Sequence, residues 1–237
     1  MKGKRKEKSS KMLVIEAVAA IIALSYLVFL QQKVFVFSRI VCIGDSITAG
    51  NKLNDAQPTY CEKLGGALGK PSFIFAFSGA DSKSMAEWSG YFRIRPQSLV
   101  LIMLGTNDAG KRASGSEFKS NMKHIIENTN NENLLILLVP PDVDFSNSNV
   151  SAYYSRTEYS NIQQDVRDLG KDNSLMVVDL SKTLDEINGT RLGDGVHPTA
   201  FGQYIILLNF LHQVKNSPIS EVILNETKGS LPPIPTG

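Results

Sequence analysis

The sequence has few cysteine and histidine residues, with two and three respectively among 237. So few cysteines exclude a disulfide-rich scaffold and a zinc or iron–sulfur site built from several thiolates. We expect Cys42 and Cys61 to be buried free thiols, because the first lies in an apolar run and the second in a helical pattern. His124 and His212 lie in helical patterns without a second ligand four residues later, so the sequence predicts no metal site.

The chain also lacks a strong net charge. Its formal charge is +2, and its first 11 residues carry six basic side chains against one glutamate, so the remainder is mildly acidic. A mildly acidic body gives no reason to expect nucleic acid as a partner. No GxxxxGK[ST] motif is present, and the glycines match no phosphate-binding fingerprint, which excludes a nucleotide-binding protein of those classes. A composition of 42% hydrophobic and 20% charged residues excludes a disordered chain.

An apolar segment follows the basic tail. Met12–Leu30 comprises 19 residues with one charged side chain, Glu16, and as a helix it would span about 28 Å, close to the thickness of the bilayer core. A signal anchor, a cleaved signal peptide and a buried core helix are the three interpretations. The anchor is favoured, because the segment ends in Leu-Val-Phe-Leu-Gln-Gln without a small-residue cleavage site. The preceding basic residues predict a cytoplasmic amino terminus and an extracytoplasmic body, with secretion after cleavage as the alternative.

These features divide the chain into five parts. We expect a basic cytoplasmic tail at 1–11, a single transmembrane signal anchor at 12–30, a short linker at 31–38, a folded domain at 39–217 and an irregular Pro-rich tail at 218–237. The folded domain is long enough to bury its own core.

Within the folded domain, five short apolar runs alternate with amphipathic stretches. Each run is continuously apolar, which is typical of a strand covered on both faces. The runs are Ile40–Ile43, Phe73–Phe77, Leu99–Leu104, Leu134–Val139 and Leu175–Val178. Between them, apolar residues spaced three and four apart predict helices. The pattern predicts an α/β domain with a five-stranded parallel sheet between two helical layers, and functional residues at the carboxyl ends of its strands.

Four short motifs lie at or near those strand ends. The first strand ends in GDSIT, the second is followed by SGAD, the third ends in GTND, and DGVHP precedes the last helix. In this order and at these places, the motifs resemble the four blocks of the SGNH family of GDSL-type esterases and lipases, over about residues 39–214. The resemblance implies a flavodoxin-like three-layer α/β/α sandwich with strand order 2-1-3-4-5, and an enzyme that hydrolyses carboxylic esters.

The residues of these motifs can also be assigned chemical roles directly. The hydroxyl of Ser46 needs a neighbouring base to act as a nucleophile, and His197 can take its proton and return it to the leaving alcohol. Asp194, three residues before the histidine, can hold the imidazole in the required tautomer. Gly79 offers a backbone N–H to the oxyanion and Asn107 a side-chain amide, and the resemblance adds the N–H of Ser46 as a third donor. These groups suffice for ester hydrolysis without a metal or an organic cofactor.

Each motif has a purely structural interpretation as well. Gly44-Asp45-Ser46 can form a strand-to-helix turn, GTND can form a second turn, and His197-Pro198 can begin a helix. Four such coincidences in family order favour the catalytic interpretation. We expect Asp108 to order its loop by hydrogen bonding and to take no part in catalysis.

The sequence is less specific about the substrate. The stretches FAFSGADS and LIMLGTNDA look most like family members that deacetylate carbohydrates, and less like the thioesterase and lysophospholipase branch. Transfer of the acyl group to a glycan and a catalytically silent binding module are further alternatives. The expected partners are an acyl ester and, through the anchor, a membrane; the oligomeric state is not indicated. Segments 80–95 and 140–154 are expected to shape the pocket with their aromatic residues, Trp88, Tyr91, Phe92, Phe145, Tyr153 and Tyr154.

Overall fold

The computed structural model describes residue 18 and residues 36–54, 56–130, 132–185 and 187–224. The predicted tail at 1–11, the anchor at 12–30 apart from residue 18, and residues 31–35 of the linker lie outside these ranges, as do residues 225–237. Among the helices of the described ranges, none combines the length and the apolar character needed to span a bilayer.

The five predicted strands form one parallel sheet. The strands are β1 (Arg39–Gly44), β2 (Ser72–Ala76), β3 (Ser98–Met103), β4 (Leu134–Val139) and β5 (Met176–Asp179). They lie in the order β2-β1-β3-β4-β5, and every neighbouring pair is parallel. Both the parallel sheet and its strand order are therefore confirmed. Residues of β3 and nearly all of β1 and β4 are buried, which explains why these runs are continuously apolar.

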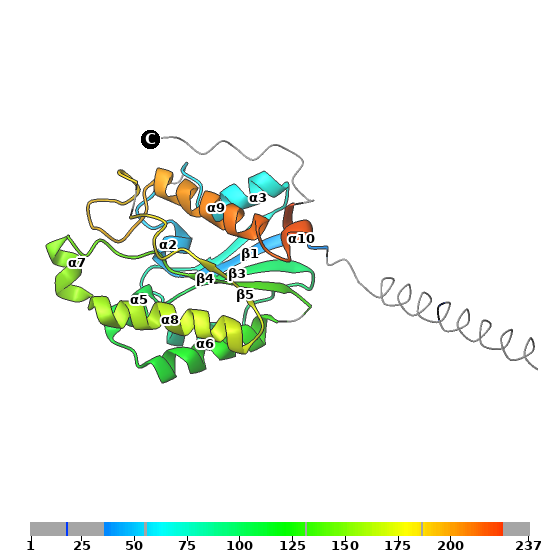
Figure 1. Cartoon of the computed structure of the whole chain (residues 1–237), viewed down its shortest axis with the longest axis horizontal. Coiled ribbons are helices and arrows are strands. Elements are labelled where there is room, and N and C mark those ends of the chain that lie inside the picture. Colours follow the sequence, from blue (N-terminus) through cyan, green and yellow to red (C-terminus); the bar gives the residue numbers. More distant parts are fainter. Residues whose placement is uncertain (1–17, 19–35, 55, 131, 186, 225–237) are drawn as a thin grey trace, which may run out of the picture. The chain divides into compact units, whose positions relative to one another are not determined.

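Helices cover both faces of the sheet (Figure 1). Helices α3, α9 and α10 lie on one face, and α4, α6 and α8 lie on the other, with the short helix α5 at the carboxyl edge. The described helices are α2 (Ser46–Ala49), α3 (Tyr60–Leu68), α4 (Ser82–Ser89), α5 (Thr106–Lys111), α6 (Gly115–Thr129), α7 (Ser148–Tyr153), α8 (Arg156–Asp172), α9 (Ala200–Lys215) and α10 (Ser220–Leu224).

Polar side chains fix where the long helices begin. Thr59 accepts the N–H of Glu62, and Glu62 accepts the N–H of Thr59, which is a complete capping box at the start of α3. Ser114 caps α6 and Ser155 caps α8, and each side chain accepts one backbone N–H of its helix. The apolar stripes of these helices face the sheet as their spacing predicts.

Helix α9 is apolar around much of its circumference and buries more than one side. Its residues Tyr204 and Leu208 are only partly buried, whereas Ile206, Phe210 and Val214 are almost completely buried. The helix contacts β5, α3 and α10, so neighbours on several sides cover it. A nearly uniformly apolar helix has no single stripe from which to read its buried face.

The prediction of two free thiols is wrong. Cys42 of β1 and Cys61 of α3 form a disulfide, and no free cysteine is present among the described residues. Helix α3 packs on the face of β1 that carries Cys42, which brings the two Cα atoms to 6.3 Å, a separation that a disulfide spans. Both cysteine side chains are fully buried. The disulfide therefore joins a central strand to its covering helix beneath the protein surface.

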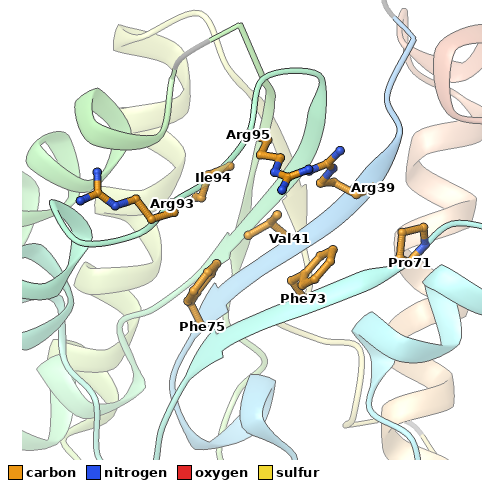
Figure 2. Close-up of a pocket in the computed structure, with 8 residues that line it drawn as sticks. All are labelled: Arg39, Val41, Pro71, Phe73, Phe75, Arg93, Ile94 and Arg95. Carbon is orange, nitrogen blue, oxygen red and sulfur yellow. The ribbon is translucent and has the colours of Figure 1, made fainter.

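A cavity of about 320 Å³ opens at the opposite edge of the sheet from the four motifs (Figure 2). It lies beside the amino ends of β1 and β2 and is lined by residues that include Arg39, Phe73 and Arg95. Of the predicted pocket segment 80–95, residues 93–95 line this cavity, whereas Ala80 and Ser82 at its start contact the GTND motif. Residues 82–89 form α4, which leads away from the motif edge, and Phe92 stacks on Phe75 in the middle of β2 with ring centroids 4.7 Å apart.

Candidate active site

Ser46 lies where β1 passes directly into α2. Asp45 caps this short helix, because its side chain accepts the N–H of Ile47 at 2.9 Å. Ser46 is the first residue of the helix and is 6% exposed. This abrupt strand-to-helix junction holds the serine at the carboxyl end of a central strand.

His197 contacts both other members of the predicted triad. Its Nε2 lies 3.0 Å from Oγ of Ser46, and its Nδ1 lies 2.8 Å from Oδ2 of Asp194. In the tautomer that satisfies both contacts, Nδ1–H donates to the carboxylate and Nε2 accepts the serine proton. The structure therefore brings together three side chains that come from opposite ends of the domain.

The Asp194 carboxylate has further donors around it. Its Oδ1 accepts the backbone N–H groups of Val196 and His197, both at 3.0 Å, and Lys52 forms an ion pair with Oδ2. Partial burial raises the pKa of Asp194, but the Lys52 ammonium and these N–H groups outweigh that effect and hold the pKa well below its ordinary value. Asp194 is thus kept ionised. Lys52 was not anticipated, because nothing in its sequence surroundings marks it as a partner of a residue so distant in the chain.

A second carboxyl group lies directly under the nucleophile. Asp45 is 1% exposed, and its Oδ2 has no hydrogen-bond partner among the described residues. Burial raises the pKa of Asp45 to about 7, although the bond from Ile47 N–H opposes this shift. A neutral carboxylic acid at this position avoids an unpaired charge in the core.

The predicted oxyanion donors follow the two strands that flank β1. Gly79 comes after β2 with φ +75°, a left-handed conformation, and a Cβ built on it meets no atom within 4 Å. The backbone angle is therefore what favours glycine at this position. Asn107 comes after β3, and its Nδ2 donates to the carbonyl of Ala80 at 2.8 Å. That bond fixes the amide beside the Gly79 loop and leaves the second N–H of Nδ2 for a ligand.

The hydrogen bonding expected of Asp108 is confirmed. Its carboxylate accepts the backbone N–H of Ser82 at 3.1 and 3.0 Å and the hydroxyl of Ser82 at 2.5 Å. Asp108 is 1% exposed and points away from solvent. It ties the loop after β3 to the start of α4, and so positions the Asn107 and Gly79 loops relative to each other.

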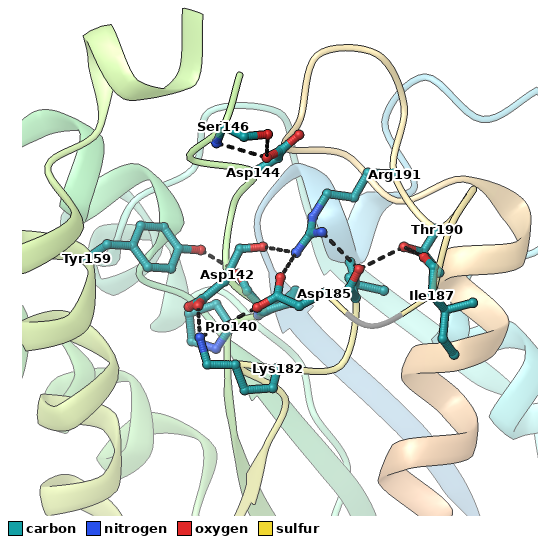
Figure 3. Close-up of polar contacts among 12 residues, drawn as sticks. Pro140, Asp142, Asp144, Ser146, Tyr159, Lys182, Asp185, Ile187, Thr190 and Arg191 are labelled. Atoms are coloured by element: carbon teal, nitrogen blue, oxygen red, sulfur yellow. Dashed lines mark hydrogen bonds and ion pairs between the residues drawn. The ribbon is translucent and has the colours of Figure 1, made fainter. Parts of the chain in front are cut away.

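The loop that carries Asp194 and His197 is held by the segment after β4 (Figure 3). The guanidinium of Arg191 donates to the carbonyl of Leu184 at 2.8 Å, to the carbonyl of Asp142 at 2.7 Å and to the side chain of Asp185 at 2.6 Å. The N–H of Asp144 donates to the carbonyl of Gly195 at 2.7 Å. No sequence pattern indicated Arg191, because its three acceptors belong to two different loops.

Aromatic residues of the other predicted pocket segment remain near this edge. Tyr154 is largely buried. Burial first, then the neighbouring Tyr153 and the charges of Asp45 and Asp194, raise the pKa of Tyr154 to about 12. Tyr153 is 52% exposed, and its ring lies against Gly110 of α5, one helical turn beyond Asn107. No group of three or more potential metal ligands is clustered in the part of the chain that the structure describes.

Comparisons with known proteins agree with this geometry. The model of the GDSL-like lipase/acylhydrolase family matches residues 42–205. A lipase/acylhydrolase from Enterococcus faecalis has a TM-score of 0.63 at 21% identity, covering 75% of this chain and 96% of its own. An acetylxylan esterase from Geobacillus stearothermophilus has a TM-score of 0.60 at 17% identity, covering 77% of this chain and 96% of its own. At such identities the two solved structures share the fold, and no curated protein sequence matches the chain. The match to the family model covers well over half of the chain, which therefore belongs to the GDSL-like lipase/acylhydrolase family and is an SGNH-type ester hydrolase.

Proposed function

We propose that the protein is a serine esterase that removes acetyl or other small acyl groups from carbohydrates, through an acyl-enzyme on Ser46. The observation that carries this proposal is the continuous chain of contacts from Ser46 Oγ to His197 and on to Asp194, at 3.0 and 2.8 Å. A serine so placed has the base that its hydroxyl needs.

In the first half of the reaction, Ser46 Oγ attacks the carbonyl carbon of the ester while its proton passes to Nε2 of His197. Asp194 remains ionised and stabilises the imidazolium. The negative charge on the carbonyl oxygen is met by the N–H groups of Ser46 and Gly79 and by the amide of Asn107. The tetrahedral intermediate then expels the alcohol, which takes the proton from Nε2, and the acyl group stays on the serine.

In the second half, water replaces the alcohol. His197 removes a proton from the water molecule, the resulting hydroxide attacks the acyl carbon, and the proton returns to Ser46 as the carboxylic acid leaves. A glycan hydroxyl in place of water would give acyl transfer by the same steps. The proton of Ser46 and one proton of the water pass through Nε2, and the N–H donors meet the oxyanion charge, so these residues complete the cycle without a metal.

A carbohydrate substrate is supported by the position of Tyr153. Its ring is half exposed and lies against Gly110 of α5, the helix that also carries Asn107. An exposed aromatic face at this position suits stacking against a sugar ring. The likeness of the SGAD and GTND stretches to carbohydrate deacetylases points in the same direction.

An extracytoplasmic, membrane-anchored location is part of the proposal. It rests on the apolar run Met12–Leu30 and the basic residues before it. The Cys42–Cys61 disulfide supports it independently, because disulfides persist mainly in oxidising compartments outside the cytoplasm.

The test measures the rates at which the full-length protein hydrolyses four substrates. They are p-nitrophenyl acetate, acetylated xylo-oligosaccharides, lysophospholipid and an acyl thioester. We expect Ser46→Ala to lose at least about a thousandfold in kcat and to lose labelling by a fluorophosphonate probe. Ser120→Ala, an exposed serine of α6, is the matched control and should retain both.

Each outcome of this assay has a defined meaning. Preference for the acetylated oligosaccharides supports the proposed substrate, and preference for lysophospholipid or thioester contradicts it. Transfer of acetyl to a supplied glycan in place of release as acetate identifies an acyltransferase. Labelling of the intact protein that is unaffected by Ser46→Ala would refute Ser46 as the nucleophile.

A further inference from the structure

Two arginines line the same cavity at the amino edge of the sheet, opposite the Ser46 edge. Arg39 is the first residue of β1, and Arg95 lies in the segment that leads into β3. Figure 2 shows their guanidinium groups next to each other at the mouth of the cavity, whereas Arg93 points away from them. The two charges thus converge from separate parts of the chain.

Neither guanidinium has an acidic partner in the described part of the protein. Arg95 makes no ion pair there, and the side chain of Arg39 donates only to the hydroxyl of Ser38, at 3.2 and 3.1 Å. The residues that line the cavity include three arginines and no carboxylate. Two like charges that line the same cavity repel each other, and an anion bound between them removes that repulsion.

The surroundings of this charge pair are apolar. Val41 and Phe73 lie below the guanidinium groups in the cavity, and Phe73 is 48% exposed. Val36, where the described domain begins, is 53% exposed. A site of this composition suits an anion that adjoins an apolar phase. The phosphate of a phospholipid at a bilayer surface meets both requirements.

The position of this surface in the chain favours a membrane over a second copy of the protein. Eight residues separate the end of the predicted anchor, Leu30, from Arg39, and they reach at most about 28 Å when fully extended. The edge that carries Arg39 must therefore stay close to an anchoring bilayer. A two-fold contact between two copies would instead bring four arginines together without a carboxylate to pair them.

We infer that the amino-edge face, defined by Val36, Arg39, Phe73 and Arg95, docks on the surface of an anionic bilayer, with lipid phosphates bound by the two arginines. This inference rests on the proposed anchor. Strand β1 has six residues, so Ser46 at its far end lies about 20 Å from the docked edge. The active site then faces away from the bilayer, toward glycans of the cell envelope and away from the lipids of the same membrane.

The experiment is hydrogen–deuterium exchange on the full chain, reconstituted into vesicles of phosphatidylcholine alone or mixed with phosphatidylglycerol. Peptides from 36–41, 71–75 and 93–97 should exchange more slowly on the mixed vesicles, and high salt should remove the difference. The double variant Arg39→Gln/Arg95→Gln should shift the docking equilibrium about 25-fold toward the undocked state, because each arginine contributes about fivefold on an anionic surface. Lys123→Gln, an exposed charge on α6, is the matched control.

The results separate this inference from the proposed function. Equal exchange on the two kinds of vesicle, or wild-type protection in the double variant, would overturn docking. Protection by inorganic phosphate on neutral vesicles would identify a free-anion site and would equally overturn it. The rate of p-nitrophenyl acetate hydrolysis, measured in the same samples, should be the same for the wild type and the double variant. The esterase assay therefore tests the proposed role of Ser46, and the exchange assay tests docking.

Discussion

Lys52 forms an ion pair with Asp194 across 142 residues of sequence, on the same carboxylate oxygen that receives the Nδ1 proton of His197. The lysine belongs to the loop after α2 and has φ 67°, an uncommon conformation for a residue with a side chain. The loop after α2 thus places the Lys52 ammonium beside the Asp194 carboxylate. Lys52 is a positioning residue, since it acts on the imidazole only through Asp194.

We expect Lys52→Met to move the acid limb of the pH profile of kcat/KM to higher pH by about half a unit. Without the ammonium, the carboxylate charge next to the imidazole is uncompensated and favours the imidazolium, which cannot accept the serine proton. Lys52→Arg keeps the positive charge and should retain the wild-type profile. If both variants lose activity equally with unchanged profiles, the ion pair has only a structural role.

Arg191 provides a test of the support beneath the catalytic loop. Arg191→Lys can satisfy only part of its three contacts with Leu184, Asp142 and Asp185. We expect kcat to fall between about tenfold and a hundredfold with little change in KM, because the loop that carries His197 is displaced. Arg112→Lys, which alters an exposed pair with Glu158 at 3.7 Å, is the control. Equal losses in both variants would show that Arg191 does not position the loop.

The disulfide is expected to stabilise the fold without assisting the chemistry. The Cys42→Ala/Cys61→Ala variant opens a loop with a sequence separation of 19 residues, which should lower the free energy of unfolding by about 3 kcal/mol. Urea denaturation measures this loss, and kcat at low temperature should remain near that of the wild type. Dithiothreitol should lower the melting temperature of the wild type and leave the variant unchanged. An equal effect of the reductant on both proteins would contradict a disulfide in solution.

The sequence predicted the features that local patterns encode. Strand positions follow from uninterrupted apolar runs, and the residues that meet at the active site follow from motifs at strand ends, since parallel strands present their carboxyl ends at one edge. Contacts that depend on packing between distant elements were not predictable. The pairing of Cys42 with Cys61 depends on where α3 rests on the sheet, and the pairing of Lys52 with Asp194 depends on how two loops meet.

No sequence pattern predicted that the carboxyl group of Asp45 is buried, because its burial depends on the elements that pack over it. In the folded protein its pKa is about 7, against an ordinary value of 3.8. Between these two pH values the folded state keeps a proton that the unfolded chain releases. This contribution to stability is present in full below pH 4 and is lost as the pH rises through 7.

Asp45→Asn should remove this dependence, because an asparagine stays neutral and its side-chain oxygen can still accept the N–H of Ile47. We expect the variant to gain stability relative to the wild type as the pH rises from 4 to above 7, by up to about 4 kcal/mol. Urea denaturation across this range measures the difference, with Asp172→Asn at the exposed end of α8 as the control. A constant difference between Asp45→Asn and the wild type at all pH values would mean that Asp45 is ionised in the folded protein. The charge beneath Ser46 would then have to be balanced by a group that moves toward it in solution.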